Sequence, residues 1–190
     1  MTEVVLYHHV QGLTEGVRSF ANELRRAGHT VHTPDLFGGH TFGTLEEGMA
    51  FAREAGFGAL VERGVAAAEE IGGDAVYAGF SFGVMVAQRL AQTRPGARGA
   101  LLVSAALPAS EFGGSWPRGV PLQIHMMEDD KLAEEDLPAA RELVEMVDGA
   151  QLFLYPGDRH LFADSSLPDY DEAAAELVKE RVQAFLADVG

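Results

Sequence analysis

The stretch Ala75-Val76-Tyr77-Ala78-Gly79-Phe80-Ser81-Phe82-Gly83 runs directly into Val84-Met85-Val86-Ala87-Gln88-Arg89-Leu90. An apolar, strand-like run ends at a glycine, a serine follows two residues later, and a second glycine opens a helix-like pattern. This is the Gly-x-Ser-x-Gly spacing of a sharp strand-to-helix turn, which projects its serine from the edge of a sheet. Glycines on both sides remove the Cβ atoms that would collide in so tight a bend. The stretch therefore predicts a strand, an exposed nucleophile at Ser81 and a helix.

Short apolar runs and helix-like segments alternate on both sides of this turn. Strands are expected at 3–8, around Val31, at 75–78, 99–103, 122–126 and 151–155, and helices at 14–28, in two pieces between 44 and 73, at 82–93, 137–147 and 169–186. Strands that alternate with helices form βαβ units, which build a parallel sheet covered on both faces. We therefore expect one α/β domain over residues 1–190, with a mostly parallel, doubly wound sheet of about six strands.

Composition excludes several classes of protein. The formal net charge of −15 disfavours nucleic acid and anionic membranes as partners, because both would repel such a surface. The chain has no cysteine, so it has neither a disulfide framework nor a thiol nucleophile. It shows no signal-peptide pattern, and no apolar run approaches the ~20 residues that span a bilayer. These features favour a cytoplasmic location and leave the oligomeric state open, a homodimer included.

The loops after the predicted strands hold the other groups that would activate a serine. All these loops lie at the carboxyl edge of a parallel sheet, where such folds bind ligands. A serine hydroxyl needs a base within hydrogen-bond reach and a third group that orients the base. The acids Glu128, Asp129 and Asp130 follow the fifth strand, and His160 follows the sixth. The order serine, acid, histidine is the one expected for an elbow of this kind.

A tetrahedral oxyanion needs two preorganised N–H donors. The backbone of Phe82, at the start of the elbow helix, would supply one donor. The loop after the first strand, around His9, Val10 or Gln11, would supply the other, and Val10 is its central residue.

Taken together, these motifs resemble the dienelactone hydrolase family, over nearly the whole chain. The matching stretches are Pro34-Asp35-Leu36-Phe37, Gly79 to Gly83, His125-Met126-Met127-Glu128-Asp129-Asp130, Tyr155-Pro156-Gly157 and His160-Leu161-Phe162. The resemblance implies a reduced α/β-hydrolase fold and hydrolysis of ester bonds. It places the family's acid on Asp130, with Asp129 as the alternative one residue away, and its base on His160. The strand order that the resemblance implies is 2-1-3-4-5-6.

Three positions depart from the family's pattern. Ser81 stands where the family usually has cysteine, and His8 or His9 stands where it usually has a glutamate that manages the thiol's proton. The two changes agree, because a serine uses His160 as its base. Asp164 stands where true dienelactone enzymes carry an arginine for the substrate carboxylate. We expect Asp164 to repel such a carboxylate, so that arginine at this position would improve turnover of anionic lactones.

These observations predict a serine hydrolase of a small carboxylic ester, lactone or thioester that forms an acyl-enzyme and needs neither a cofactor nor a metal. Six side chains are candidates for the wall of the substrate pocket: His8, His9, Phe37, Phe80, Trp116 and Phe162. Aromatic residues at strand ends are also common in plain cores, and adjacent histidines in a strand point to opposite faces. The alternatives are a carboxylesterase or thioesterase of another substrate class, and a non-catalytic small-molecule binder on the same scaffold.

Overall fold

A computed structural model describes residues 1–190 and contains one parallel sheet with the strand order β2-β1-β3-β4-β5-β6. The strands are β1 (Glu3–Tyr7), β2 (Thr30–His32), β3 (Val76–Phe80), β4 (Gly99–Val103), β5 (Leu122–Met127) and β6 (Gln151–Tyr155). Every neighbouring pair is parallel, which confirms both the predicted fold class and the predicted order. The order reverses between β1 and β3, so the loops after these two strands flank the crevice where parallel sheets bind ligands.

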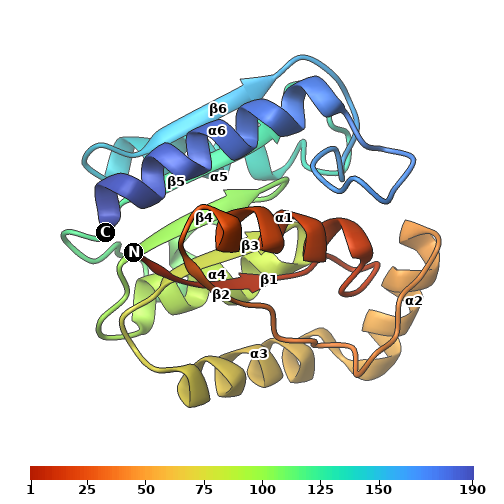
Figure 1. Ribbon diagram of the computed structural model, residues 1–190, viewed down its shortest axis with the longest axis horizontal. Helices are drawn as coiled ribbons and strands as arrows, with labels where there is room; N and C mark the ends of the chain where they lie inside the picture. Colours follow the sequence, from red (N-terminus) through yellow and green to blue (C-terminus); the bar gives the residue numbers. More distant parts are fainter.

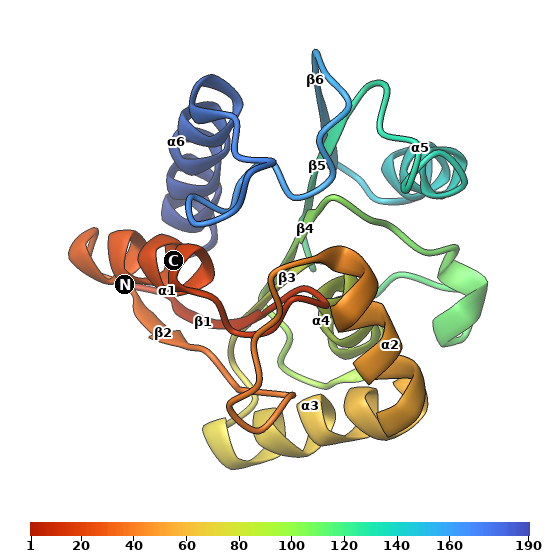
Figure 2. The ribbon, with the colours of Figure 1, turned by 90° about the vertical axis from the view of Figure 1, so that its right-hand side faces the viewer.

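Helices cover both faces of the sheet (Figures 1 and 2). One face carries α1 (Glu15–Arg26) and α6 (Glu172–Val189), and the other carries α3 (Phe57–Ile71), α4 (Phe82–Thr93) and α5 (Asp136–Met146). A short 3₁₀ helix, η1 (Ala109–Phe112), interrupts the long loop after β4. The helix α2 (Leu45–Ala55) lies beyond the carboxyl ends of the strands (Figure 1). None of the helices combines the length and the apolar character that crossing a bilayer requires.

The helix α1 shows how the sequence fixes these elements. Its residues Val17, Phe20 and Leu24 recur at spacings of three and four, and all three are buried against the sheet. Thr14 begins the helix by accepting a hydrogen bond from the Val17 N–H. The predicted helix at 14–28 is therefore confirmed to within two residues at each end.

Several element boundaries differ from the predictions by one to three residues, and two of them show the physical reason. Strand β3 continues to Phe80, two residues past the predicted end, because Phe80 still pairs with Val103 of β4. The last helix begins at Glu172 instead of 169, because the Asp171 side chain caps it by accepting from the Ala174 N–H. Both shifts come from tertiary pairing or capping that the apolar periodicity does not encode.

Two histidines inside the fold make its stability depend on pH. Burial lowers the pKa of His8 to about 4 and that of His125 to about 3. An unfolded histidine binds its proton near pH 6.5, which is well above the pKa of either buried ring. Between these pH values the unfolded chain binds protons that the folded chain does not, and the unfolded state is stabilised. We expect the free energy of unfolding to fall by several kcal/mol between about pH 6.5 and 4.

Urea unfolding at closely spaced pH values measures this loss. The variant His125→Gln lacks one of the two groups, so its unfolding free energy should fall less steeply over the same range. A free energy of unfolding that stays level down to pH 4.5 would contradict the assignment of neutral, buried histidines.

Candidate active site

Ser81 lies at the bend between β3 and α4, in a backbone conformation that non-glycine residues rarely adopt. Its φ is 48° and its ψ is −111°. The Ser81 N–H donates to the Val103 carbonyl at 2.8 Å, which anchors the bend to the neighbouring strand. A Cβ on Gly79 would lie 2.4 Å from the Gly83 backbone, and one on Gly83 would lie 2.4 Å from the Tyr7 carbonyl oxygen. The strained elbow therefore requires both glycines, as the sequence predicts.

Replacing Gly83 with alanine should destabilise the fold by about 3 kcal/mol or more, because the new methyl group meets backbone atoms that cannot rotate away. Gly58, near the start of α3, is the matched control, since a Cβ there has no neighbour within 4 Å. Gly58→Ala should stabilise the fold by roughly 0.5 kcal/mol. Chemical denaturation measures the free energy of unfolding of both variants. Equal stability of the two would contradict the close approach of the backbone at the elbow.

The elbow serine, a histidine and a carboxylate form one hydrogen-bonded chain. Ser81 Oγ lies 2.7 Å from His160 Nε2, and His160 Nδ1 lies 2.6 Å from Asp130 Oδ2. The other carboxylate oxygen of Asp130 accepts from the Leu132 N–H at 3.0 Å, which fixes the carboxylate behind the ring. His160 and Asp130 are 7% and 5% exposed, so little water competes for these bonds. This geometry suits a serine nucleophile, a general base and an orienting acid.

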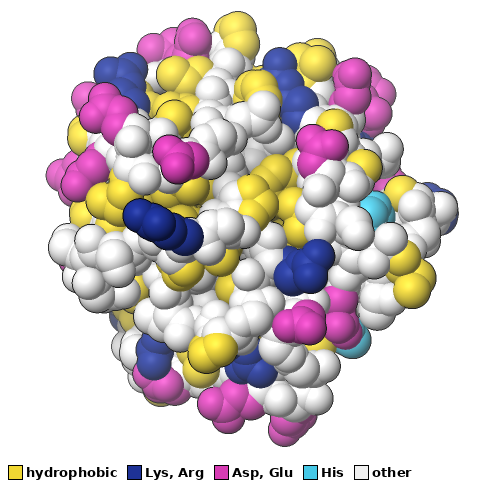
Figure 3. All heavy atoms as spheres, turned by 90° about the vertical axis from the view of Figure 1, so that its left-hand side faces the viewer, with side chains coloured by type: hydrophobic (Ala, Val, Ile, Leu, Met, Phe, Trp, Pro, Cys, Tyr) yellow, Lys and Arg dark blue, Asp and Glu magenta, His cyan; other side chains and the backbone are white.

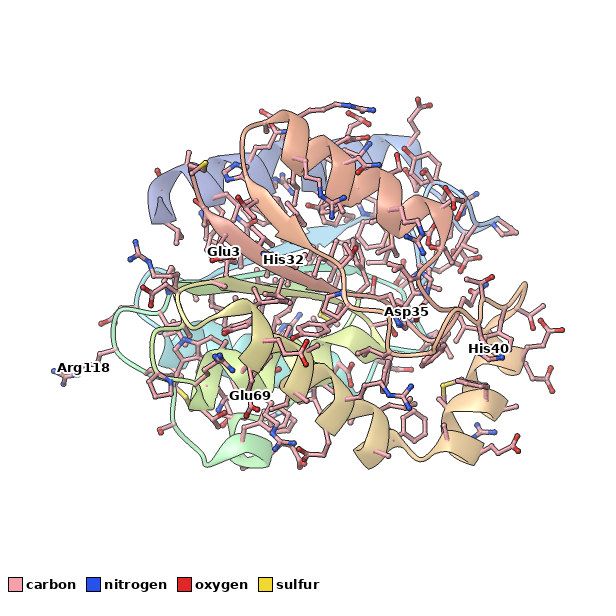
Figure 4. All side chains as sticks on the ribbon, turned by 60° about the horizontal axis from the view of Figure 1, so that its bottom comes forward. Glu3, His32, Asp35, His40, Glu69 and Arg118 are labelled. Carbon is pink, nitrogen blue, oxygen red and sulfur yellow. The ribbon has the colours of Figure 1, made fainter.

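The structure distinguishes the candidates that the sequence left open. Asp130 lies behind the imidazole, whereas Asp129 is exposed and its side chain has no hydrogen bond. Among the seven histidines, only His160 forms a hydrogen bond with Ser81. His32 pairs with Glu3 at 2.8 Å on the exposed β2 edge of the sheet, and His40 lies in the loop after β2 (Figure 4).

Two residues whose backbone N–H groups have no partner in the protein line the cavity beside Ser81. Val10 and Phe82 both line this cavity, and neither backbone N–H donates to another group of the protein. Phe82 begins α4, where the first N–H groups of a helix have no partner within it. The predicted oxyanion donors, Phe82 and Val10, therefore lie at the same site as Ser81.

The cavity has a volume of about 580 Å³ and a mostly hydrophobic wall. Besides Ser81, His160 and the two N–H residues, it is lined by Leu45, Glu46, Met49, Arg53, Phe57, Met85, Ala105, Leu107, Leu132 and Asp136. None of the six predicted pocket residues, His8, His9, Phe37, Phe80, Trp116 and Phe162, is among them, so this prediction was wrong. The aromatic side chains that do line the cavity are Phe57 and Phe82.

The mispredicted residues have structural roles instead. Phe37 and Phe162 lie in the core, and Phe80 packs edge-on against Phe20 beneath α1. Trp116 donates to the Val120 carbonyl in the loop after η1. His8 and His9 are fully buried in the turn after β1. A strand-end position alone does not decide whether a side chain faces the cavity or the core.

Asp164 also lies away from the cavity, contrary to the prediction that it repels substrate. It is 2% exposed, and its carboxylate accepts hydrogen bonds from His9, Thr14 and Ser166. Burial alone would raise the pKa of Asp164, but the hydrogen bonds from His9, Ser166 and Thr14 outweigh it and lower that pKa. Arginine at this position would break a buried network, so the predicted gain in turnover of anionic lactones was wrong.

The sequence predicts a helix in the region of α2, but it was not predicted that this helix lines the cavity. Leu45, Met49 and Arg53 recur every four residues along α2, and all three line the cavity. That spacing was the available signal, since residues four apart share one helix face. Asp136, at the start of α5, also lines the cavity, and burial raises its pKa.

A second hollow lies at the opposite end of the strands, the end that Figure 3 faces. Its volume is about 670 Å³, and its charged lining residues are Arg98, Arg181 and Asp188. It contains no serine or histidine, so the cavity at Ser81 is the candidate active site despite its smaller volume. Nowhere does the fold bring three or more His, Asp or Glu side chains into an arrangement that could hold a metal ion.

This parallel sheet, with its elbow serine followed by an acid and a histidine, defines an α/β hydrolase. The family model described as "Dienelactone hydrolase family" matches residues 1–190, so the chain belongs to the dienelactone hydrolase family. Membership of this family makes it a hydrolase of ester bonds. No curated protein is similar enough in sequence to count as a match.

Solved structures share the fold at low sequence identity. A putative dienelactone hydrolase from Klebsiella pneumoniae is 17% identical, with a TM-score of 0.75 over 98% of this chain and 87% of that one. A dienelactone hydrolase-like promiscuous phosphotriesterase from metagenomic libraries is 19% identical, with a TM-score of 0.76 over 100% of this chain and 87% of that one. The dienelactone hydrolase from Anabaena variabilis is 19% identical, with a TM-score of 0.69 over 98% and 86%.

Proposed function

We propose that the chain is a serine hydrolase that cleaves a small carboxylic ester, lactone or thioester through an acyl-enzyme. The observation that carries this proposal is the 2.7 Å contact between Ser81 Oγ and His160 Nε2, with Asp130 behind the ring. A serine that was only tolerated at a tight turn would not need this aligned base and acid.

In the proposed reaction, His160 Nε2 takes the proton of Ser81 as Oγ attacks the substrate carbonyl. The N–H groups of Val10 and Phe82 stabilise the oxyanion, and His160 then gives the proton to the leaving group. Water then attacks the acyl group on Ser81, with His160 again as the base; the bond to Oγ breaks, the acid product leaves, and His160 returns the proton to Ser81 Oγ. Asp130 holds the His160 Nδ1–H and stabilises the imidazolium. The small-molecule substrate would place an apolar acyl group against α2 and Phe57, because hydrophobic side chains dominate that wall.

Rapid-mixing kinetics with p-nitrophenyl acetate and butyrate tests the proposal. An acyl-enzyme predicts a burst approaching one nitrophenol per chain when deacylation is slower than acylation, followed by steady turnover. A folded protein that gives neither burst nor turnover, with these esters or with small lactones and thioesters, would instead be a binding protein on a hydrolase scaffold.

A further inference from the structure

Two adjacent buried histidines surround the peptide that carries one of the free N–H groups. The Val10 N–H belongs to the peptide whose carbonyl oxygen is that of His9. This oxygen accepts from the His8 ring Nδ1 at 2.7 Å and from the Gly12 N–H at 3.0 Å. A peptide is planar, with its C=O and N–H pointing in opposite directions. Fixing the direction of the His9 oxygen therefore fixes the Val10 N–H in the opposite direction, and Val10 lines the cavity beside Ser81.

The His8 ring is held in the form that donates to this oxygen. Its Nε2 accepts from the Leu36 N–H at 3.0 Å, so the proton of the neutral ring lies on Nδ1. The ring is fully buried and packs edge-on against Phe37. No other tautomer of a neutral His8 satisfies both the Leu36 N–H and the His9 carbonyl.

The His9 ring fixes the other side of Val10. Its Nδ1 accepts from the Gln11 N–H at 3.2 Å, and its Nε2 lies 2.7 Å from Asp164 Oδ2. The imidazole therefore bridges from the residue after Val10 to the segment that begins at His160. Thr14 and Ser166 complete the hydrogen bonds to the same carboxylate. The loop of the N–H donor and the loop of the histidine base are thus joined through one buried contact.

We propose that His8 and His9 are positioning residues that aim the Val10 N–H at the oxyanion formed on Ser81. This inference rests on the proposed function. Neither side chain lines the cavity, so both act through the His9–Val10 peptide. Hydrogen bonds that a carbonyl accepts also polarise the N–H of the same peptide, which strengthens it as a donor. This positioning role explains why two adjacent histidines are fully buried at the end of a strand.

Two variants of His8 separate positioning from packing. His8→Asn keeps a donor at the place of Nδ1 and loses the acceptor for Leu36, whereas His8→Gln keeps a group at the place of Nε2 and loses the donor to His9. Each loses one buried hydrogen bond, so their stabilities should be similar. Loss of a single oxyanion donor typically costs 10²- to 10³-fold in kcat, and a misdirected donor costs less. We expect His8→Gln to lower kcat about ten- to hundred-fold with KM unchanged, and His8→Asn to stay within about threefold of wild type.

A phenylboronic acid, which forms a tetrahedral anion on a catalytic serine, supplies the second readout. Its inhibition constant should rise for His8→Gln by about the factor by which kcat falls, since both depend on the oxyanion donors. His125→Gln is the control, because His125 is equally buried and bonded to Tyr155 and Gln123 but lies outside the turn after β1. It should lose stability and leave the inhibition constant unchanged.

If the His8 variants do not fold, Asp164→Ala gives the same test through His9, with Ser166→Ala as its control. Asp164→Ala should weaken boronate binding and kcat about tenfold, and Ser166→Ala should not. Folded His8→Gln or Asp164→Ala with wild-type kcat and boronate affinity would overturn the inference and leave the proposed function intact. A wild-type protein that neither hydrolyses esters nor binds the boronate would overturn both.

Discussion

Replacing Ser81 with alanine is expected to abolish ester hydrolysis, with a loss of about 10⁶-fold in kcat, the loss seen when the nucleophile of a serine-protease triad is removed. The reason is that no other hydroxyl contacts His160 Nε2. The residual rate would come only from substrate binding and the free N–H groups of Val10 and Phe82. Steady-state hydrolysis of p-nitrophenyl butyrate measures the loss.

Ser104 provides the matched control for this substitution. It follows the neighbouring strand β4, also has a positive φ, 65°, and its buried hydroxyl has no hydrogen-bond partner. Ser104→Ala removes the same hydroxyl group as Ser81→Ala. It should nevertheless keep kcat within a few-fold of wild type. Comparable losses in the two variants would mean that general damage to the sheet edge, and not removal of a nucleophile, explains the Ser81 result.

Changing Asp130 to asparagine is expected to lower kcat by about 10⁴-fold with little change in structure. The amide can present its NH₂ group to His160 Nδ1, which favours the tautomer with its proton on Nε2 and removes the base from Ser81. It also removes the negative charge that stabilises the imidazolium. The pH dependence of kcat/KM should show the loss at every pH where wild type is active.

Asp129→Asn is the control, because it removes the same charge from an exposed residue next to Asp130. It should keep wild-type kcat. If Asp129→Asn lost as much activity as Asp130→Asn, the acid loop would have to adopt a different register during catalysis from the one in the structure.

The features that local patterns encode were predictable from the sequence. The apolar runs and the Gly-x-Ser-x-Gly turn gave the strands, and the resemblance to the family gave their order, 2-1-3-4-5-6. Because the carboxyl ends of parallel strands share one edge, the loops with Ser81, Asp130 and His160 had to lie near one another. Their 2.7 Å and 2.6 Å contacts follow from topology more than from any single motif.

The wall of the cavity was not predictable in the same way. The wall depends on the position of α2, which follows a long loop, and no local sequence pattern determines that position. Gly48 illustrates the constraint, because a Cβ there would lie 2.0 Å from the Val10 carbonyl oxygen. A contact between residues so far apart in sequence brings Leu45, Met49 and Arg53 over Ser81.

The prediction that Asp164 repels a substrate carboxylate was wrong for a related reason. A sequence shows that a carboxylate is present, but it does not show whether solvent, substrate or buried donors surround it. Here the partner of Asp164 is His9, 155 positions away along the chain. Gly16 also approaches this carboxylate so closely that a Cβ would overlap it, so the network was fixed by packing that spans the chain.

Labelling with a fluorophosphonate probe, followed by peptide mass spectrometry, tests the central claim most directly. The account predicts one phosphonyl group per folded wild-type chain, attached to Ser81, and no label on the Ser81→Ala protein. A folded wild-type protein that stays unlabelled, or that carries the group on another residue, would contradict it.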